Sequence, residues 1–132
     1  MLRTLKRRFC KSEDGSVTVE AMLWIPMFAV FFLSIADVAL IFYGQSQMFR
    51  VAQDGNRLLS IGRLTDEDET EAYIVARMAE IGKPVRVETS ISADNVITTV
   101  VKGTTGDFDA VGVFGVLTNV EMAISSQHVK EL

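Results

Sequence analysis

Hydrophobic residues dominate one continuous stretch near the start of the chain, from Gly15 to Gly44. This stretch contains no Lys or Arg, and only Glu20 and Asp37 interrupt its apolar character. A helix needs about 20 apolar residues to cross the hydrocarbon core of a membrane. The stretch is longer than that, so the pattern predicts a transmembrane helix over residues 16–44.

Beyond Gly44 the apolar residues become periodic rather than continuous. In Gln45–Ile61 they recur at spacings of three, four and seven with polar residues between them, as in an amphipathic helix. The apolar positions are Met48, Val51, Ala52, Leu58 and Leu59. We therefore expect one helix from about Val17 to Ser60 that ends at Gly62, with residues 45–62 as its extension past the membrane.

Residues 63–132 predict a small domain that contains a helix and a sheet. The helix is expected to begin at a Thr65 cap and to end before Gly82 and Pro84. Its expected apolar stripe consists of Tyr73, Val75, Ala76, Met78, Ala79 and Ile81. Alternating apolar and polar residues then predict three antiparallel strands, over 85–92, 96–102 and 119–129. The segment from Phe108 to Leu117 fits either a short helix or an irregular crossing.

These elements predict an α+β fold, in which a long N-terminal transmembrane helix precedes a small domain of one helix and a roughly three-stranded antiparallel sheet. The predicted organisation is a leader over 1–15, a membrane helix over 16–44, a helical extension over 45–62 and an α+β domain over 63–132.

Charge separates the leader from the rest of the chain. Residues 1–15 carry five basic and two acidic residues, and the net charge of the whole chain is −4. The leader is therefore basic and the remainder acidic. Basic residues next to a span stay on the cytoplasmic side, so the domain is expected on the outer side. No basic patch with interleaved aromatics follows the span, which argues against nucleic-acid binding.

The composition offers little for catalysis or metal binding. Cys10 is the only cysteine and lies in the leader without a lipobox, so we interpret it as a reduced cytoplasmic thiol. His128 is the only histidine, and no group of residues has metal-ligand spacing. We therefore expect no cofactor, no metal site, no small-molecule substrate and no enzymatic activity.

Three residues of the apolar stretch need an explanation. Pro26 lies inside the predicted helix, where it removes one backbone hydrogen bond and predicts a kink or a locally melted turn. Asp37 fits either an interface residue or a packing contact. Glu20 is costly in an apolar environment, and it follows Gly15 by five positions.

The run from Asp14 to Phe28, DGSVTVEAMLWIPMF, resembles the TadE-like family of pseudopilins. The resemblance rests on a basic leader followed by an acidic residue, a glycine, small residues, Val-Glu, an apolar run and a proline. The matching positions are Asp14, Gly15, Val19, Glu20 and Pro26. Asp37 late in the span, a helical extension and a β-rich end with Glu131 also agree. Ala21 stands where aromatic residues are frequent in major Flp pilins, which favours a minor subunit.

The resemblance implies a structural, non-catalytic role in assembly of a tight-adherence (Flp) type IV pilus. It also implies cleavage between Gly15 and Ser16 by a membrane prepilin peptidase, which makes Glu20 the fifth mature residue. The new amine of Ser16 would then meet the Glu20 carboxylate within one subunit or between neighbours. Glycine suits the cleavage site because it leaves the backbone unhindered.

The implied partners are the inner membrane, the prepilin peptidase, other pilins and pseudopilins, and the Tad secretion platform. The implied location is the bacterial inner membrane, with the N-terminus cytoplasmic and the domain periplasmic, and association with the pilus after processing. The alternative is an unprocessed single-span membrane protein whose periplasmic domain binds a partner.

Overall fold

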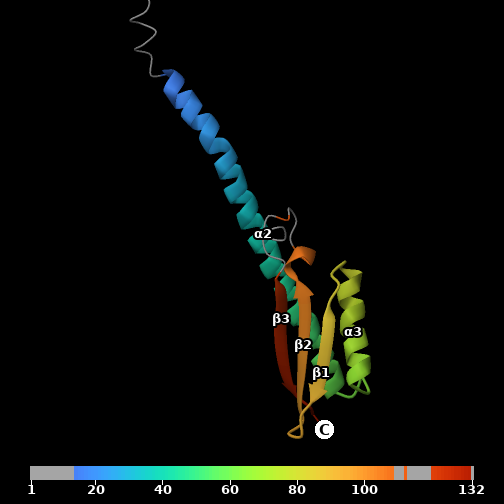
Figure 1. Cartoon of the computed structure of the whole chain (residues 1–132). Helices are drawn as coiled ribbons and strands as arrows, with labels where there is room; N and C mark the ends of the chain where they lie inside the picture. Colours follow the sequence, from blue (N-terminus) through green and yellow to red (C-terminus); the bar gives the residue numbers. More distant parts are fainter. Residues whose placement is uncertain (1–13, 109–111, 113–119, 132) are drawn as a thin grey trace, which may run out of the picture. The chain divides into compact units, whose positions relative to one another are not determined.

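The computed structural model describes the backbone of residues 14–108, 112 and 120–131 (Figure 1). Its first described element is a helix, α2, which runs without a break from Asp14 to Ser60. The chain divides between Ser34 and Ile35 into two compact units, and α2 contributes to both. The prediction of one helix through the apolar stretch and its extension is confirmed.

Both α-helices of the described residues end in the same hydrogen-bonding motif. After α2, the N–H of Gly62 bonds to the carbonyl of Leu59 and the N–H of Arg63 bonds to that of Leu58. After α3 (Glu67–Glu80), Gly82 and Lys83 repeat the pattern on Ala79 and Met78. The two glycines have φ angles of 72° and 71°, in the left-handed region that glycine adopts without strain.

The start of α3 differs from the prediction in detail. Asp66, not Thr65, is the N-cap, and its side chain accepts a hydrogen bond from the N–H of Glu69 at 2.8 Å. The Glu69 carboxylate in turn accepts the N–H of Thr65 at 2.8 Å. Asp66 is the N-cap because this reciprocal pair of hydrogen bonds satisfies two backbone N–H groups at once.

The buried face of α3 is also displaced from the predicted stripe. It consists of Thr70, Ile74 and Met78, whereas Val75 and Ile81 are 40% and 50% exposed. Thr70 belongs to the buried face because its hydroxyl donates to the carbonyl of Asp66, which satisfies it within the helix. The prediction for Met78 is confirmed, and the predictions for Val75, Ala76, Ala79 and Ile81, which are exposed, are wrong.

Three antiparallel strands form one sheet in the order β1-β2-β3. Their bounds are β1 Arg86–Ile91, β2 Val96–Thr104 and β3 Glu121–Val129. Asn95, with a φ angle of 58°, turns the chain between β1 and β2. The predicted α+β class and three-stranded sheet are therefore confirmed, and most of the ambiguous segment from Phe108 to Leu117 lies outside the described residues.

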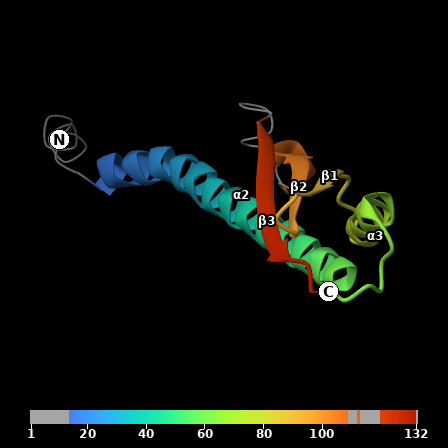
Figure 2. The same cartoon turned by 90° about the horizontal axis from the view of Figure 1, so that it is seen from below.

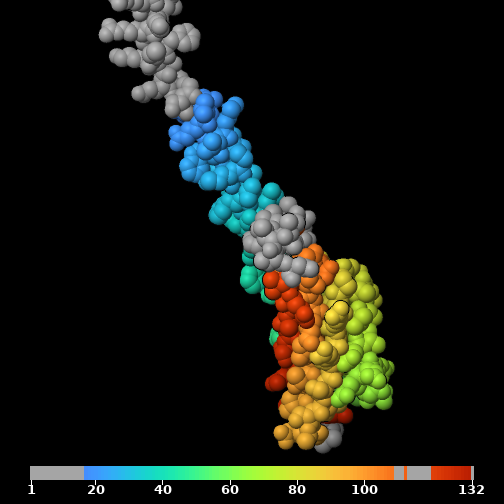
Figure 3. Space-filling view, viewed as in Figure 1, coloured from blue at the N-terminus to red at the C-terminus, as the bar shows by residue number. Residues whose placement is uncertain are grey.

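The core of the domain lies on one face of the sheet, where the second half of α2 and the helix α3 pack (Figure 2). Buried side chains from α2, α3, β2 and β3, together with Phe108 after the 3-10 helix η1 (Thr105–Asp107), form the centre of this cluster: Met48, Ala52, Ile74, Met78, Val101, Phe108 and Met122. No helix covers the other face of the sheet in the view of Figure 3. Burial of one face explains the alternation of buried and more exposed residues along β2.

Polar side chains are buried at the contact between α2 and the sheet. The Thr99 hydroxyl donates to the Oδ1 of Asn56 at 2.6 Å, and the Asn56 Nδ2 donates to the carbonyl of Ser126 at 3.1 Å. The hydroxyls of Thr89 and Thr99 lie 3.1 Å apart. This chain of contacts reaches all three strands, so the register of α2 on the sheet is specified by direction-dependent bonds.

Candidate functional site

The predicted processing site lies in the first turn of α2. The helix begins at Asp14, so the peptide bond between Gly15 and Ser16 has helical backbone geometry. The first four N–H groups of a helix have no partner within it, and glycine weakens a helix by about 1 kcal/mol relative to alanine. This turn therefore opens at a lower cost than the interior of the helix.

The apolar residues that follow are turned outward along their whole length. From Val17 to Leu33 every side chain is exposed, and Leu23 reaches 74%. The most apolar window of α2 is 6% buried, and the helix is long and apolar enough to cross a membrane once. Exposed apolar surface on this scale requires a cover of lipid or protein.

Glu20 belongs to this exposed surface. Its side chain points away from the helix axis among exposed neighbours such as Val19 and Leu23. In a membrane a carboxylate in this position needs a polar partner. The geometry therefore leaves Glu20 accessible to a second helix.

Pro26 lies inside the helix, which continues through it as regular α-helix. The locally melted turn that the sequence allowed is therefore not present. A proline cannot donate a hydrogen bond to the carbonyl four residues earlier, here that of Met22. The kink at Pro26 remains a prediction.

Asp37 is fully buried, with 0% of its surface exposed. It begins a buried or half-buried stripe on α2 that continues through Ile41, Gly44, Met48 and Ala52 at spacings of four and three. The same spacing continues into the core of the domain. Asp37 is thus a packing residue of the second unit, as one of the two sequence-based alternatives predicted, and its side chain is not solvated.

Gly44 ends the apolar stretch and contacts an aromatic ring. A Cβ atom built on Gly44 would lie 2.0 Å from the Cδ1 of Phe108, and one on Gly103 would lie 2.9 Å from its Cε2. Phe108 is 2% exposed, and the Lys83 ammonium lies 5.0 Å from its ring centre. The two glycines therefore form a cradle that admits this ring.

A second close approach joins the two helices of the domain. A Cβ atom on Gly55 would lie 2.9 Å from the side chain of Ile74. Nearby, the Tyr73 hydroxyl donates to the Asp54 carboxylate at 2.6 Å. This hydrogen bond, together with burial and the charge of Asp54, raises the pKa of Tyr73 above its ordinary value of 10.0.

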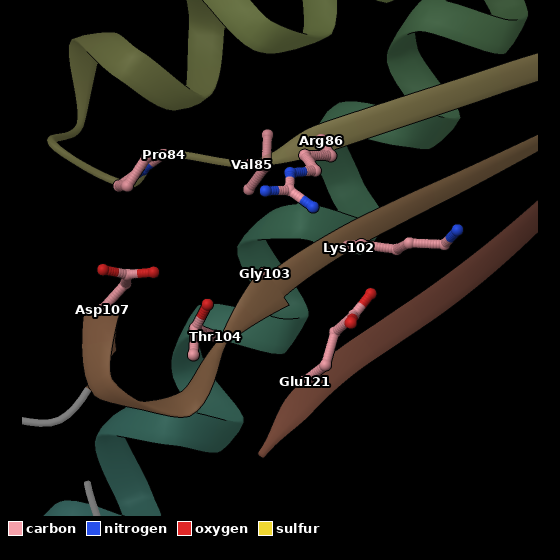
Figure 4. Close-up of a pocket in the computed structure, with 8 residues that line it drawn as sticks. All are labelled: Pro84, Val85, Arg86, Lys102, Gly103, Thr104, Asp107 and Glu121. Atoms are coloured by element: carbon pink, nitrogen blue, oxygen red, sulfur yellow. The ribbon is translucent and has the colours of Figure 1, made fainter. Parts of the chain in front are cut away.

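The open face of the sheet carries a groove of about 510 Å³ (Figure 4). Its charged residues are Arg86, Lys102, Asp107 and Glu121. Arg86 lies opposite Lys102 in the β1–β2 register, and Lys102 pairs with Glu88 at 2.9 Å. Both signs of charge line the groove, so it selects no one class of charged ligand.

Within the described ranges, no three His, Cys, Asp or Glu side chains are grouped in a way that suits a metal ion. His128 is exposed on β3. The arrangement of the described residues offers surfaces for packing and membrane contact, and no assembled nucleophile, base and orienting group.

Comparison with known protein families locates one match, at the N-terminal part of the chain. Residues 15–57 match the model of the TadE-like protein family. The resemblance inferred from Gly15, Glu20 and Pro26 is thereby confirmed. The TadE-like segment begins at the predicted cleavage glycine, includes the apolar stretch and ends before the α+β domain. Curated proteins yield no match to this chain, and solved structures yield none either.

Sequence reasoning missed two features within this TadE-like segment. The buried stripe was expected to begin at Met48, whereas it begins at Asp37. The spacing from Asp37 through Ile41, Gly44 and Met48 already had the helical period, but two of these four residues are not large apolar ones. Asn56 is also buried although its side chain is polar. Only its position between Ala52 and Leu59 indicated that it lies on the core face.

Proposed function

We propose that this chain is a minor pseudopilin that contributes to assembly of a tight-adherence type IV pilus, and that it is structural rather than catalytic. The TadE-like match over residues 15–57 is the observation that carries the proposal, because it begins at Gly15 and includes Glu20. The basic leader before Gly15 supports a cytoplasmic N-terminus in the bacterial inner membrane. In this arrangement the α+β domain is periplasmic.

A prepilin peptidase would cleave between Gly15 and Ser16 at the cytoplasmic face. The bond lies in the first turn of α2, which begins at Asp14, and the end of a helix opens more readily than its interior, which supports access by the peptidase. Cleavage removes the basic residues that hold the leader in the cytoplasm. The subunit then remains in the bilayer only through its apolar helix, which suits a component that later leaves the membrane.

The burial of Asp37 suggests where the lipid-exposed part of the helix ends. Between Val17 and Ala36 the helix has 20 residues, and at 1.5 Å per residue these extend about 30 Å, the thickness of the hydrocarbon core. From Asp37 onward one face of the helix is covered by the domain. We therefore place the outer membrane boundary near Asp37, earlier than Gly44.

Glu20 would act in assembly. After cleavage, the amine of Ser16 and the Glu20 carboxylate are four positions apart on the helix, or they meet across two neighbouring helices. An ion pair in an apolar bundle fixes register, because a subunit that is displaced along its neighbour leaves a buried charge unpaired. The exposed position of Glu20 supports the second arrangement.

Co-purification tests the proposal. The full chain with a C-terminal tag is expressed in cells that contain a tight-adherence system and its prepilin peptidase, and in matched cells without the peptidase. Pilin subunits should co-purify from the first cells with a shortened form of the chain. Co-purification of an uncleaved form with a periplasmic protein, and no pilins, would support the alternative of a permanently anchored binding protein.

A further inference from the structure

The two edge strands of the sheet, β1 and β3, differ in the contacts that the rest of the domain makes with them. At β1, the Glu71 carboxylate accepts the N–H of Thr89 at 2.6 Å and the Glu67 carboxylate accepts that of Ile91 at 2.8 Å. Two outward-facing donors of this edge are thus satisfied by side chains of α3. An edge that is capped in this way is protected against pairing with another strand.

The outer edge of β3 carries an equivalent row of backbone groups. In an antiparallel sheet, the residues whose N–H and C=O groups face a given neighbour alternate along each strand. Thr89 faces α3, so its partner Thr99 faces β3 and meets Ser126. The outward-facing residues of β3 are therefore the odd-numbered ones: Glu121, Ala123, Ser125, Gln127 and Val129.

All five of these residues are exposed. Among the hydrogen bonds between described residues that involve side chains or loops, none reaches their backbone groups. In Figure 3, β3 forms the margin of the sheet opposite to α3. Within the described chain, this edge is therefore available to a further strand.

The usual devices that protect an edge strand are missing from β3. It is nine residues long, and its sequence EMAISSQHV contains neither Pro nor Lys. Its register with β2 is continuous from Glu121 to Val129, so no bulge twists the edge away. A long and regular edge, whose only charged outward-facing residue is Glu121 at its start, is a template for strand addition, whose main-chain bonds recognise an extended polypeptide.

We propose that the outer edge of β3 binds an extended segment of a different protein, which adds a fourth strand to the sheet. The small uncharged side chains of Ala123 and Ser125 permit close approach on the open face. On the opposite face, the half-buried Ile124 provides apolar surface. The segment that fits both faces alternates between polar and apolar residues.

The direction of β3 argues against a second copy of this chain as the occupant. Gln45 contacts Met122 at 3.4 Å and Asn56 contacts Ser126 at 3.1 Å, so β3 runs in the same direction as this part of α2. An antiparallel pair of β3 strands would point the two α2 helices in opposite directions. Two copies anchored in one membrane with the same topology cannot meet in this way, a step that rests on the proposed function.

A parallel pair of β3 strands is also disfavoured. A two-fold axis along the strands would place Ser125 beside its own copy with the two side chains on opposite faces, whereas neighbouring residues in a sheet point to the same face. The β1 edge of a second copy is capped by Glu67 and Glu71. The occupant is therefore a different protein.

Photo-cross-linking of the full chain in cells that produce the pilus tests this surface. A benzophenone amino acid is placed at Ala123 or at Gln127, with Ser90 on β1 as the control, since it is exposed but distant from the β3 edge in the strand order. We expect one adduct of the same size from Ala123 and Gln127, and none from Ser90. Mass spectrometry should place the two cross-linked partner residues about four positions apart, as in an extended strand.

Ser125→Pro provides the test of main-chain recognition, with Ser125→Ala as its matched control. Proline removes one outward N–H and leaves the bonds to β2 in place, which an edge strand tolerates. The adduct should fall about tenfold for Ser125→Pro, as expected for the loss of about 1.4 kcal/mol of binding, and remain for Ser125→Ala. Gln127→Pro, probed from Ala123, serves the same purpose if Ser125→Pro does not fold.

Three results would overturn the inference: no adduct from either edge position, an adduct with the mass of two copies of this chain, or a yield that proline does not reduce. Intact mass of the same samples reports leader cleavage separately. An adduct without cleavage would leave the strand-binding edge standing and reject the proposed pilin role, whereas cleavage without an adduct would do the reverse.

Discussion

Thr99 on β2 and Asn56 on α2 share a buried hydrogen bond of 2.6 Å between the threonine hydroxyl and the amide oxygen. Both side chains are 0% exposed, and Asn56 also donates to the carbonyl of Ser126. The contact joins the helix that begins in the membrane to the sheet. Its satisfied polar groups fix one orientation of the helix, whereas apolar contacts alone would tolerate several.

Replacement of Asn56 by Ala should lower the free energy of unfolding by about 2–3 kcal/mol, because it removes two hydrogen bonds and leaves the Thr99 hydroxyl buried without this acceptor. The measurement is denaturant unfolding of the full chain in detergent. The matched control is Gln53→Ala, an exposed position on the same helix, where a change within about 0.5 kcal/mol is expected. Equal effects at the two positions would show that the buried network does not stabilise the domain.

Gly44→Ala should destabilise the domain by about 1–3 kcal/mol, because the added methyl group overlaps the ring of Phe108. Ser46→Ala, at an exposed position two residues along the helix, is the control. In a double-mutant cycle, the cost of Gly44→Ala should shrink in a Phe108→Ala background, since the overlapping ring is gone. An unchanged cost in that background would contradict the cradle.

The periodicity of the apolar residues was sufficient to predict the helices and strands. It was not sufficient to predict which face of each helix is buried. The continuous α2, the three strands and the glycine-terminated helices follow from apolar spacing and from Gly62 and Gly82. The face of α3 was assigned wrongly because Thr70 is buried and Val75 is not. Spacing alone does not reveal that a threonine satisfies its hydroxyl within its own helix.

The residues of the candidate site were likewise only partly predictable from the sequence. Gly15 and Glu20 were identified from sequence because their chemistry is unusual beside an apolar run. The role of Asp37 stayed open between an interface residue and a packing contact, because spacing alone does not show whether a polar residue of a helix is buried. The contacts of Gly44 and Gly55 with large side chains were equally inaccessible, since they depend on Phe108 and Ile74, which are distant in sequence.

The bond between Tyr73 and Asp54 should be visible in the pH dependence of stability. Because the folded-state pKa of Tyr73 is raised, its contribution is fully present below pH 10.0 and is lost as the pH rises through the folded pKa. Absorbance titration should show that Asp54→Asn lowers the pKa of Tyr73. Tyr43→Phe isolates the Tyr73 signal, because Tyr43 and Tyr73 are the two tyrosines. An Asp54→Asn protein with an unchanged tyrosine titration would contradict the assignment.

Glu20→Ala should separate processing from assembly. The scissile bond and its leader are unchanged, so we expect cleavage to continue, while loss of the carboxylate should abolish recovery of the subunit with other pilins. Glu20→Gln preserves size and removes the charge, and should behave like Glu20→Ala. Normal cleavage together with normal recovery in both variants would reject the pairing between Glu20 and the amine of Ser16.

The mass of the N-terminal peptide, measured by mass spectrometry on protein from cells with and without a prepilin peptidase, tests the central claim most directly. With the peptidase, the account predicts a chain that begins at Ser16 and has lost residues 1–15. Without the peptidase, residues 1–15 should remain. The Gly15→Val chain should retain residues 1–15 in cells with the peptidase and in cells without it. An N-terminus at Met1 in cells with an active peptidase would contradict the account.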